Sequence, residues 1–345
     1  MYSLQIAGYI NRSNDLDSLI DWGYEAFQSL SDYEIIKLLE DYDDAMQDFR
    51  ALLSVNSENL VSDTVIFRDV TGLATADLFM KFRLLRQVND REQSPIAKLR
   101  DKKWFAKVVH KCVQLEDKYN ITFNTLINVS RFTNFQQSLG NFLPSVAKGI
   151  YDYYCGIDNA RILDMSAGFG GRLVGAVSSK HNYSYTGVDP ATETFMNLRK
   201  LAKFLNVENR VRLINKAFED CDDDLEDNSF DIMFTSPPYF AKEKYSEEDN
   251  QSWKRYPDFD DWVNSFLKES FKIVYKKLKN NSYMIINIAD ITLHNKKYDL
   301  ENATVQTALD VGFQYLQRKQ MMMTSTPGTG RKYKTEGVFI FKKNE

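Results

Sequence analysis

The chain has 345 residues, of which 43% are hydrophobic and 27% charged, and this length predicts two domains or one large domain with an appendage. Forty-four basic and forty-eight acidic side chains give a net charge of −4, which excludes a polybasic nucleic-acid binder and an acidic disordered chain. The three cysteines lie far apart, the N-terminus lacks the apolar core of a secretory signal, and no run approaches the roughly 18–20 apolar residues of a membrane span. We therefore expect a cytoplasmic protein without membrane contact.

Residues 1–130 are predicted to form a mainly helical domain, with target recognition as its candidate role. Apolar residues recur there at spacings of three and four, for example at Leu30, Ile35, Ile36 and Leu39. Such stripes are typical of helix faces that pack in a core.

Charge gathers in one part of this helical region. Residues 81–118 carry eleven basic and five acidic side chains, although the chain as a whole is acidic. The candidate phosphate-binding residues are Arg83, Arg86, Arg91, Lys98, Arg100, Lys102, Lys103 and Lys107, interleaved with Trp104 and Phe105. Basic groups next to aromatic rings suit contact with a nucleic acid, and a solvated helix face explains the same pattern.

From Arg161 onward, short apolar runs alternate with amphipathic helices. The runs RILDM, YSYTGV, RVRLIN, FDIMFT and YMIINI predict buried strands, and their alternation with helices predicts a parallel α/β sheet over residues 131–345. The last two apolar segments, GFQYLQRKQMM and EGVFIFKK, have no helix between them. They are expected to form an antiparallel pair at the edge of the sheet.

A glycine-rich turn follows the first of these strands. Asp164 ends the strand, and Gly168, Gly170 and Gly171 lead into a helix, where the main chain can approach a ligand closely. Asp189 ends the next strand and can accept hydrogen bonds from two ribose hydroxyls. The pattern is not the Gly-x-Gly-x-x-Gly of a pyrophosphate binder, and a carboxylate at Asp164 would attract a cationic amino-acid group, so S-adenosylmethionine fits best. A structural turn or another nucleotide stays open as an alternative.

The strand FDIMFT ends in Ser236, Pro237, Pro238 and Tyr239, at the edge where open α/β sheets bind ligands. The amine of a nucleobase is a poor nucleophile because its lone pair is delocalised into the ring. The Ser236 hydroxyl and the Pro237 carbonyl can accept its two N–H bonds from a loop that proline stiffens, and Tyr239 offers a ring for stacking the base. These four residues are the predicted catalytic residues.

At these two motifs the chain resembles the amino-methyltransferases that methylate cytosine N4 or adenine N6 in DNA. The family patterns D-x-F-x-G-x-G and [DNS]-P-P-[YF] appear here as DMSAGFG at residues 164–170 and SPPY at residues 236–239. A third family element, a helix before the cofactor strand, is similar to the segment from Asn141 to Pro144. The resemblance covers roughly residues 130–345.

The resemblance implies a Rossmann-like methyltransferase sheet, mostly parallel with an antiparallel C-terminal hairpin, and S-adenosylmethionine without a metal. The implied cofactor-binding residues are Asp164, Ser166, Ala167, Gly168, Gly170, Asp189, Phe218 and Phe142. The implied substrate is double-stranded DNA, methylated at a specific site, with cytosine N4 favoured over adenine N6 because a serine precedes Pro-Pro-Tyr. A cognate restriction endonuclease is a candidate partner, and the oligomeric state is not predicted.

The chain departs from the family pattern in having no target-recognition region after its last strand. Recognition would then fall to the helical region and to loops 240–257 and 324–334. Methylation of RNA or of a protein glutamine, or a catalytically silent nucleic-acid-binding subunit, are the alternative functions. The three histidines, His110, His181 and His294, lack the neighbours of a metal site.

Overall fold

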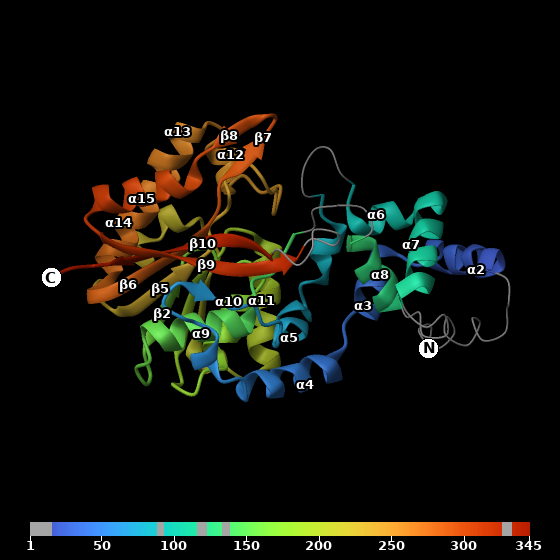
Figure 1. Cartoon of the computed structure of the whole chain (residues 1–345), viewed down its shortest axis with the longest axis horizontal. Helices are drawn as coiled ribbons and strands as arrows, with labels where there is room; N and C mark the ends of the chain where they lie inside the picture. Colours follow the sequence, from blue (N-terminus) through green and yellow to red (C-terminus); the bar gives the residue numbers. More distant parts are fainter. Residues whose placement is uncertain (1–15, 88–92, 116–122, 133–138, 326–332) are drawn as a thin grey trace. The chain divides into compact units, whose positions relative to one another are not determined.

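The computed structural model of the protein describes residues 16–87, 93–115, 123–132, 139–325 and 333–345. The chain forms two compact units (Figure 1): the first comprises residues 1–42 and 80–140, and the second residues 43–79 and 141–345. Residues 43–79, which the helical periodicity grouped with the N-terminal region, therefore lie within the second unit. The predicted domain boundary near residue 130 stays a prediction.

Helices make up the first unit. They are α2 (Leu16–Gln28), α3 (Asp32–Leu38), η2 (Lys81–Leu85), α6 (Pro95–Leu99), α7 (Lys102–Leu115) and α8 (Phe123–Phe132). Helix α3 begins at a capping box, in which Ser31 and Glu34 satisfy each other's main-chain N–H groups. The ring of Phe27 packs against the rings of Phe105 and Phe123 at centroid distances of 5.9 and 5.7 Å, and the predicted apolar stripe contributes Ile35 and Leu39 to the same core.

An eight-stranded sheet forms the second unit, in the order β1-β9-β10-β6-β5-β2-β3-β4. The strands are β1 (Val65–Ile66), β2 (Arg161–Asp164), β3 (Ser184–Val188), β4 (Val211–Ile214), β5 (Phe230–Thr235), β6 (Leu278–Ile288), β9 (Gln314–Ser325) and β10 (Tyr333–Lys342), and β7 (Ile291–Leu293) pairs with β8 (Lys296–Tyr298) in a separate hairpin. Strands β4, β3, β2, β5 and β6 are parallel, and β10 is antiparallel to both β6 and β9. The predicted fold class, a mostly parallel α/β sheet with an antiparallel C-terminal pair, is confirmed.

One strand of the sheet comes from a region that was predicted to be helical. Strand β1 pairs in parallel with β9, at Val65 with Gln320 and Ile66 with Met321, so the C-terminal hairpin is not the edge that the sequence predicted. The buried Lys319 holds this segment, because its Nζ donates to the carbonyl oxygens of Ser62 and Asp63. A two-residue strand carries too little pattern to be recognised in sequence.

Helices cover both faces of the sheet (Figure 1). On one face lie α9 (Pro144–Tyr154) and α10 (Gly171–Val177), and on the other α14 (Lys268–Lys277) and α15 (Leu300–Val311). The remaining helical elements are α4 (Tyr42–Leu53), η1 (Ser57–Asn59), α5 (Leu73–Asp77), α11 (Thr192–Phe204), η3 (Glu208–Arg210), η4 (Phe218–Asp220), η5 (Asp222–Asp224), α12 (Ser252–Arg255), α13 (Phe259–Asp261) and the π-helix η6 (Trp262–Leu267). Within the described ranges, no helix has the length and apolar character needed to cross a membrane.

The strand order places a switch point between β2 and β5. The chain runs outward from β2 through β3 to β4, then returns to the other side of β2 and continues through β5 to β6. Ligands of open α/β sheets bind in the crevice at the carboxyl ends of the strands where the order reverses. The ends of β2, β3 and β5, which carry the predicted site residues, therefore meet at one edge.

Candidate functional site

A buried carboxylate lies beneath this edge. Asp164 Oδ2 accepts from Arg172 Nε at 2.7 Å and from the Tyr185 hydroxyl at 2.6 Å. Asp164 Oδ1 accepts from the Thr235 hydroxyl at 2.8 Å, from the Ser166 main-chain N–H at 3.2 Å and from Arg172 Nη2 at 3.3 Å. The network joins the ends of β2 and β5 to β3 and to the first turn of α10. Because Asp164 has no exposed surface and Arg172 already neutralises it, its effect on a ligand is indirect.

The glycine-rich loop after β2 is fixed by hydrogen bonds to the end of β3. The Ala167 N–H donates to the Val188 carbonyl at 2.8 Å, and the Gly168 N–H donates to Asp189 Oδ2 at 2.8 Å. Gly168 has a φ of +56° and Gly170 a φ of +85°, values that residues with a side chain rarely adopt. A Cβ at Gly168 would make an ordinary contact of 3.7 Å with the Ser166 carbonyl oxygen, so the positive φ, and not a lack of room, favours glycine at this residue.

Asn141 holds this loop from the other side. Its Nδ2 donates to the carbonyl of Phe169 at 2.8 Å and to Asp77 Oδ1 at 2.9 Å, and its Oδ1 accepts the Gly171 N–H at 3.1 Å. The main chain at Gly171 lies very close to the main chain at Phe142, because a Cβ at Gly171 would lie only 1.8 Å from the carbonyl oxygen of Phe142. Asn141 was noted in the sequence only as part of a helix start, and Arg172 and Tyr185 received no predicted role.

Asp189 lies at the end of β3 and is partly exposed. Its Oδ1 accepts the Ala191 N–H at 3.0 Å, and its Oδ2 accepts the Gly168 N–H. Burial raises the pKa of Asp189 to about 7, against the lowering effect of these two main-chain donors. Each carboxylate oxygen carries two lone pairs, so each keeps capacity for one further donor.

The predicted aromatic residues Phe142 and Phe218 lie at different depths. The ring of Phe142 is partly exposed, packs on Phe234 at 5.2 Å and has the Arg172 guanidinium 5.6 Å from its centroid. Phe218 is 2% exposed and belongs to the same core cluster as Leu163 and Val188. As described, Phe218 therefore supports the loop after β4 from within and offers little surface to a ligand.

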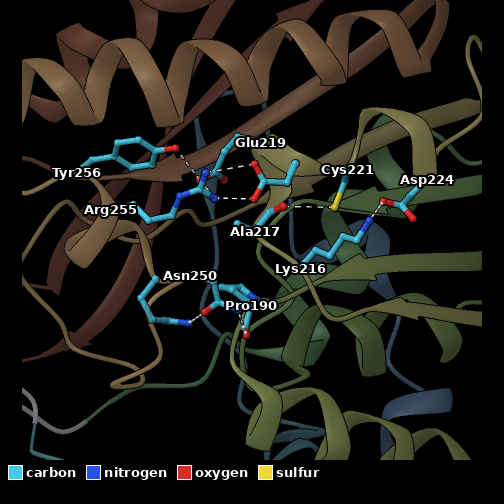
Figure 2. Close-up of polar contacts among 11 residues, drawn as sticks. Pro190, Lys216, Ala217, Glu219, Cys221, Asp224, Asn250, Arg255 and Tyr256 are labelled. Carbon is cyan, nitrogen blue, oxygen red and sulfur yellow. Dashed lines mark hydrogen bonds and ion pairs between the residues drawn. The ribbon is translucent and has the colours of Figure 1, made fainter.

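Glu219, the next residue after Phe218, is unusual for a surface acid. Its side chain is 4% exposed, and its Oε1 accepts from the Tyr256 hydroxyl at 3.0 Å and pairs with Arg255 Nη1 at 2.9 Å (Figure 2). Burial raises the pKa of Glu219, although Arg255 and Tyr256 lower it. Glu219 is therefore held by protein donors and is not a solvated surface side chain.

The four predicted catalytic residues leave the end of β5 together. Ser236 and Pro238 are partly exposed, and Pro237 and Tyr239 are buried. Burial raises the pKa of Tyr239 well above its usual value, and its hydroxyl donates to Glu336 Oε2 at 3.3 Å. The Lys242 ammonium lies 5.5 Å from the centroid of the Tyr239 ring. The phenol is thus protonated and oriented by β10.

A strained residue follows the tetrapeptide. Phe240 has a φ of +53°, a left-handed conformation that is rare for a bulky side chain. Its ring is buried and lies 5.2 Å from Tyr298, 5.5 Å from Phe259 and 6.2 Å from Trp262. These aromatic contacts hold the turn that aims Tyr239.

The structure thus brings together the glycine loop, Asp189 and the tetrapeptide.

Several residues of the basic stretch are not placed as the predicted contact with a nucleic acid requires. Phe105 is 1% exposed and belongs to the helical core, so it is not available to a base, and Arg83 is also buried. Arg100 bonds to the Leu30 carbonyl and to Asp32, and Lys102 pairs with Asp21. Arg91 and most of loop 324–334 lie outside the described residues. The described part of the chain contains no group of three or more His, Cys, Asp or Glu that could hold a metal.

The C-terminal part of the chain matches a known family model. The model described as DNA methylase, of the N6 and N4 type, matches residues 230–345. Residues 230–345 are therefore similar to the DNA methylase family. The resemblance inferred from the sequence motifs is confirmed in this region, which holds the tetrapeptide and the C-terminal hairpin.

Two curated relatives agree with this family. The Type II methyltransferase M.MjaVI of Methanocaldococcus jannaschii is 31% identical over 118 residues, which are 33% of this chain and 55% of that protein. The Type II beta methyltransferase M.BslI of a Bacillus species is 32% identical over 127 residues, which are 34% of this chain and 13% of that protein. The matches therefore span about half the length of the first relative and a small part of the second.

Solved structures are less similar. A precorrin-6y C5,15-methyltransferase from Geobacter metallireducens is 15% identical, with a TM-score of 0.42 over 61% of this chain and 92% of that chain. The fold assignment rests on the strand order of the present chain.

The buried ion pair generates a prediction about stability. Arg172→Leu should lower the free energy of unfolding by about 3–5 kcal/mol, because it leaves the Asp164 carboxylate buried without its charged partner. Arg318→Ala is the matched control: it removes a pair with Glu301 at 3.0 Å whose two side chains are partly exposed, and it should cost about 1 kcal/mol or less. Urea unfolding of both variants measures the difference. Equal losses would contradict the role given to Arg172.

Proposed function

We propose that this chain transfers a methyl group from S-adenosylmethionine to an exocyclic amine of a base in double-stranded DNA. The observation that carries the proposal is the position of Ser236, Pro237, Pro238 and Tyr239, which leave β5 beside the glycine loop of β2, with Thr235 bonded to Asp164. The DNA methylase match over residues 230–345 and the Type II methyltransferase names of both relatives support it.

The residues at the edge of the sheet fit the cofactor. Asp189 keeps one acceptor position on each carboxylate oxygen, as two ribose hydroxyls require, and Gly168, which has no side chain, lets a ligand approach the main chain. Ser166, Ala167 and Gly170 shape this loop, and Phe142 lines it. Asp164 acts through the loop, because its own oxygens are occupied by protein donors. When bound, S-adenosylmethionine supplies an electrophilic methyl group on sulfur.

The tetrapeptide acts on the target amine. The hydroxyl oxygen of Ser236 and the carbonyl oxygen of Pro237 accept its N–H bonds, which favours the pyramidal nitrogen that forms as the new bond develops. Fixed proline φ angles limit the motion of both acceptors. Tyr239 stacks on the base once the flexible Lys242 side chain leaves its ring, and the stacking offsets part of the cost of flipping the base out of the duplex.

Cytosine N4 is our preferred target over adenine N6, because Ser236 stands where adenine-specific relatives more often have Asp or Asn. Both amines offer two N–H donors, so the neutral hydroxyl could serve either and the contacts to the ring edge decide. RNA, a protein glutamine and a silent binding subunit are the alternatives. A cognate restriction endonuclease and a cytoplasmic location stay predictions.

We assign nucleic-acid contact in the first unit to a smaller set of residues than the sequence indicated. Lys103 and Lys107 are exposed on α7, and the ammonium groups of Lys98 and Lys107 lie 5.3 and 4.7 Å from the centroid of the Trp104 ring. Such a group suits phosphate neutralisation, whereas Arg100 and Lys102 are engaged within the unit.

Substitutions in the tetrapeptide test the catalytic assignment. Ser236→Ala and Tyr239→Ala should each lower methyl transfer by about 100-fold or more, because each removes a group that acts on the base. Binding of S-adenosylmethionine, measured by calorimetry, should stay close to that of the wild type. Tyr239→Phe, which keeps the ring and loses the bond to Glu336, should retain more activity than Tyr239→Ala.

The same assay identifies the substrate. The wild-type protein is incubated with labelled S-adenosylmethionine and with duplex DNA, RNA or protein, and nucleosides from the DNA are analysed by mass spectrometry. We expect N4-methylcytosine. Label in N6-methyladenine alone would contradict the preference for cytosine, and label in no DNA nucleoside would contradict the function itself.

The raised pKa of Asp189 predicts how the affinity for the cofactor depends on pH. Ribose hydroxyls donate to the ionised carboxylate, and a pKa of about 7 means that this form is lost as the pH falls through 7. Affinity for S-adenosylmethionine should therefore be about tenfold weaker at pH 6 than at pH 8. Asp189→Asn should bind more weakly and lose this part of the dependence. Parallel profiles for the two proteins, by calorimetry, would show that the hydroxyls bind elsewhere.

The basic surface is tested by salt dependence. Neutralising Lys98, Lys103 and Lys107 to glutamine should weaken binding to DNA of unrelated sequences equally and reduce the slope of log affinity against log salt by up to about 3. Lys102→Gln, at a lysine paired with Asp21, is the control and should change the slope less. An unchanged slope in the triple variant would leave this surface without a role in DNA binding.

A further inference from the structure

The segment that follows the tetrapeptide, residues 241–257, contacts the two loops that the proposed function assigns to the cofactor, after β2 and β3, and also the neighbouring loop after β4. It is folded rather than extended, since Trp253 Nε1 donates to the Ser246 carbonyl at 3.2 Å and α12 begins at Ser252. No role was predicted for it beyond target recognition. Its contacts point back toward the cofactor loops.

The first contact is with the glycine loop after β2. The ring of Tyr245 lies 6.0 Å from the ring of Phe169, the residue between Gly168 and Gly170. The Tyr245 hydroxyl donates to the carboxylate of Glu243 within the same segment. An aromatic pair therefore joins the segment to the loop whose positive φ angles shape the ligand edge.

The second contact is with the loop after β3, which carries Asp189. Glu248 accepts the Thr192 main-chain N–H at 3.0 Å and the Thr192 hydroxyl at 2.9 Å, so it caps the first turn of α11. Asn250 Nδ2 donates to the Pro190 carbonyl at 2.9 Å (Figure 2). Both partners follow Asp189 directly, within three residues.

The third contact is with the loop after β4. Arg255 donates to both carboxylate oxygens of Asp220, at 2.7 and 3.2 Å, and pairs with the buried Glu219 (Figure 2). The hydroxyl of Tyr256 adds a second bond to Glu219. A guanidinium that bridges two carboxylates fixes both the segment and the loop.

We propose that residues 241–257 form a wall of the cofactor pocket, and that Glu248, Asn250 and Arg255 are positioning residues that hold this wall against the loops after β3 and β4. The inference rests on the proposed function. Because the segment begins two residues after Tyr239, the wall of the cofactor pocket and the ring that stacks the base belong to one continuous piece of chain. A cofactor that contacts this wall would therefore also act on the piece of chain that carries Tyr239.

Arg255→Ala and Asn250→Ala test the wall, with Arg255→Lys as the conservative variant and Arg318→Ala as the matched control. The Arg255 and Arg318 side chains are similarly exposed, 29% and 35%, and each pairs with a glutamate. Calorimetry with S-adenosylmethionine gives the dissociation constants. Arg255→Ala should bind at least about tenfold more weakly, Asn250→Ala should be weakened less, and Arg255→Lys should recover part of the loss because it keeps the charge without the fork.

Two further measurements separate positioning from a general loss of structure. In steady-state assays the KM for S-adenosylmethionine should rise in Arg255→Ala, with kcat at saturating cofactor changed less. In the wild type, S-adenosylmethionine should slow tryptic cleavage after Lys242 and Lys244, and this protection should be lost in Arg255→Ala. Arg318→Ala should behave as the wild type in both.

If Arg255→Ala does not fold, Asn250→Ala decides the question. This variant removes two hydrogen bonds of a partly exposed side chain, one to the Pro190 carbonyl and one from Gln251 Nε2. Dissociation constants equal to that of the wild type in both variants would contradict the proposal that residues 241–257 form a wall of the cofactor pocket. The same result in Asn250→Ala suffices when it alone folds. Neither result would affect the proposed function. A wild-type protein that does not bind S-adenosylmethionine would overturn the proposed function, and this inference with it.

Discussion

One buried carboxylate, Asp164, holds the edge of the sheet on which the proposed site depends. It accepts five hydrogen bonds, from Arg172, Tyr185, Thr235 and the Ser166 main chain, and these donors come from α10, β3, β5 and the glycine loop. Removing a charge from water costs several kcal/mol unless geometry and partners compensate, so a buried aspartate persists only where its donors are fixed. These donors fix both the glycine loop and the start of the tetrapeptide, because Thr235 directly precedes Ser236.

The sequence predicted the strands of the sheet better than it predicted the side chains that bind Asp164. Each predicted strand of the parallel sheet is present, because a buried parallel strand is a continuous apolar run that local composition reveals. The joining of Asp164, Asp189 and Ser236 at one edge could also be predicted, since parallel strands end at the same side. The role of Arg172 could not be predicted, because an arginine in a helix is ordinarily exposed and only the fold shows that this one is buried. Phe105, on a helix that is basic in sequence, is likewise shown to be buried only by the fold, and the partly exposed Arg100 lies 5.6 Å from the centroid of the Phe27 ring.

Local preference and tertiary packing conflict at Phe240, and packing prevails. A left-handed φ costs a bulky residue roughly 1–2 kcal/mol. Three aromatic contacts, each contributing on the order of 0.5–1.5 kcal/mol, are enough to offset it. No sequence pattern announces such a residue, because phenylalanine has no preference for this conformation. The strain is stored where the chain turns from the tetrapeptide into residues 241–257, so the aromatic cluster determines the direction of both.

Asp164 and Asp189 end neighbouring strands, and their surroundings give them different tasks. Asp164 is paired with a guanidinium, and both of its carboxylate oxygens already accept hydrogen bonds from protein donors. Asp189 has only two main-chain donors, and burial raises its pKa to about 7, so its charged form is destabilised until further donors arrive. A ligand that supplies two hydroxyl donors relieves this cost, whereas it could gain nothing from Asp164. The affinity for such a ligand is therefore concentrated at the carboxylate that the protein leaves incompletely satisfied, next to the Pro190 and Thr192 main-chain groups on which residues 241–257 are anchored.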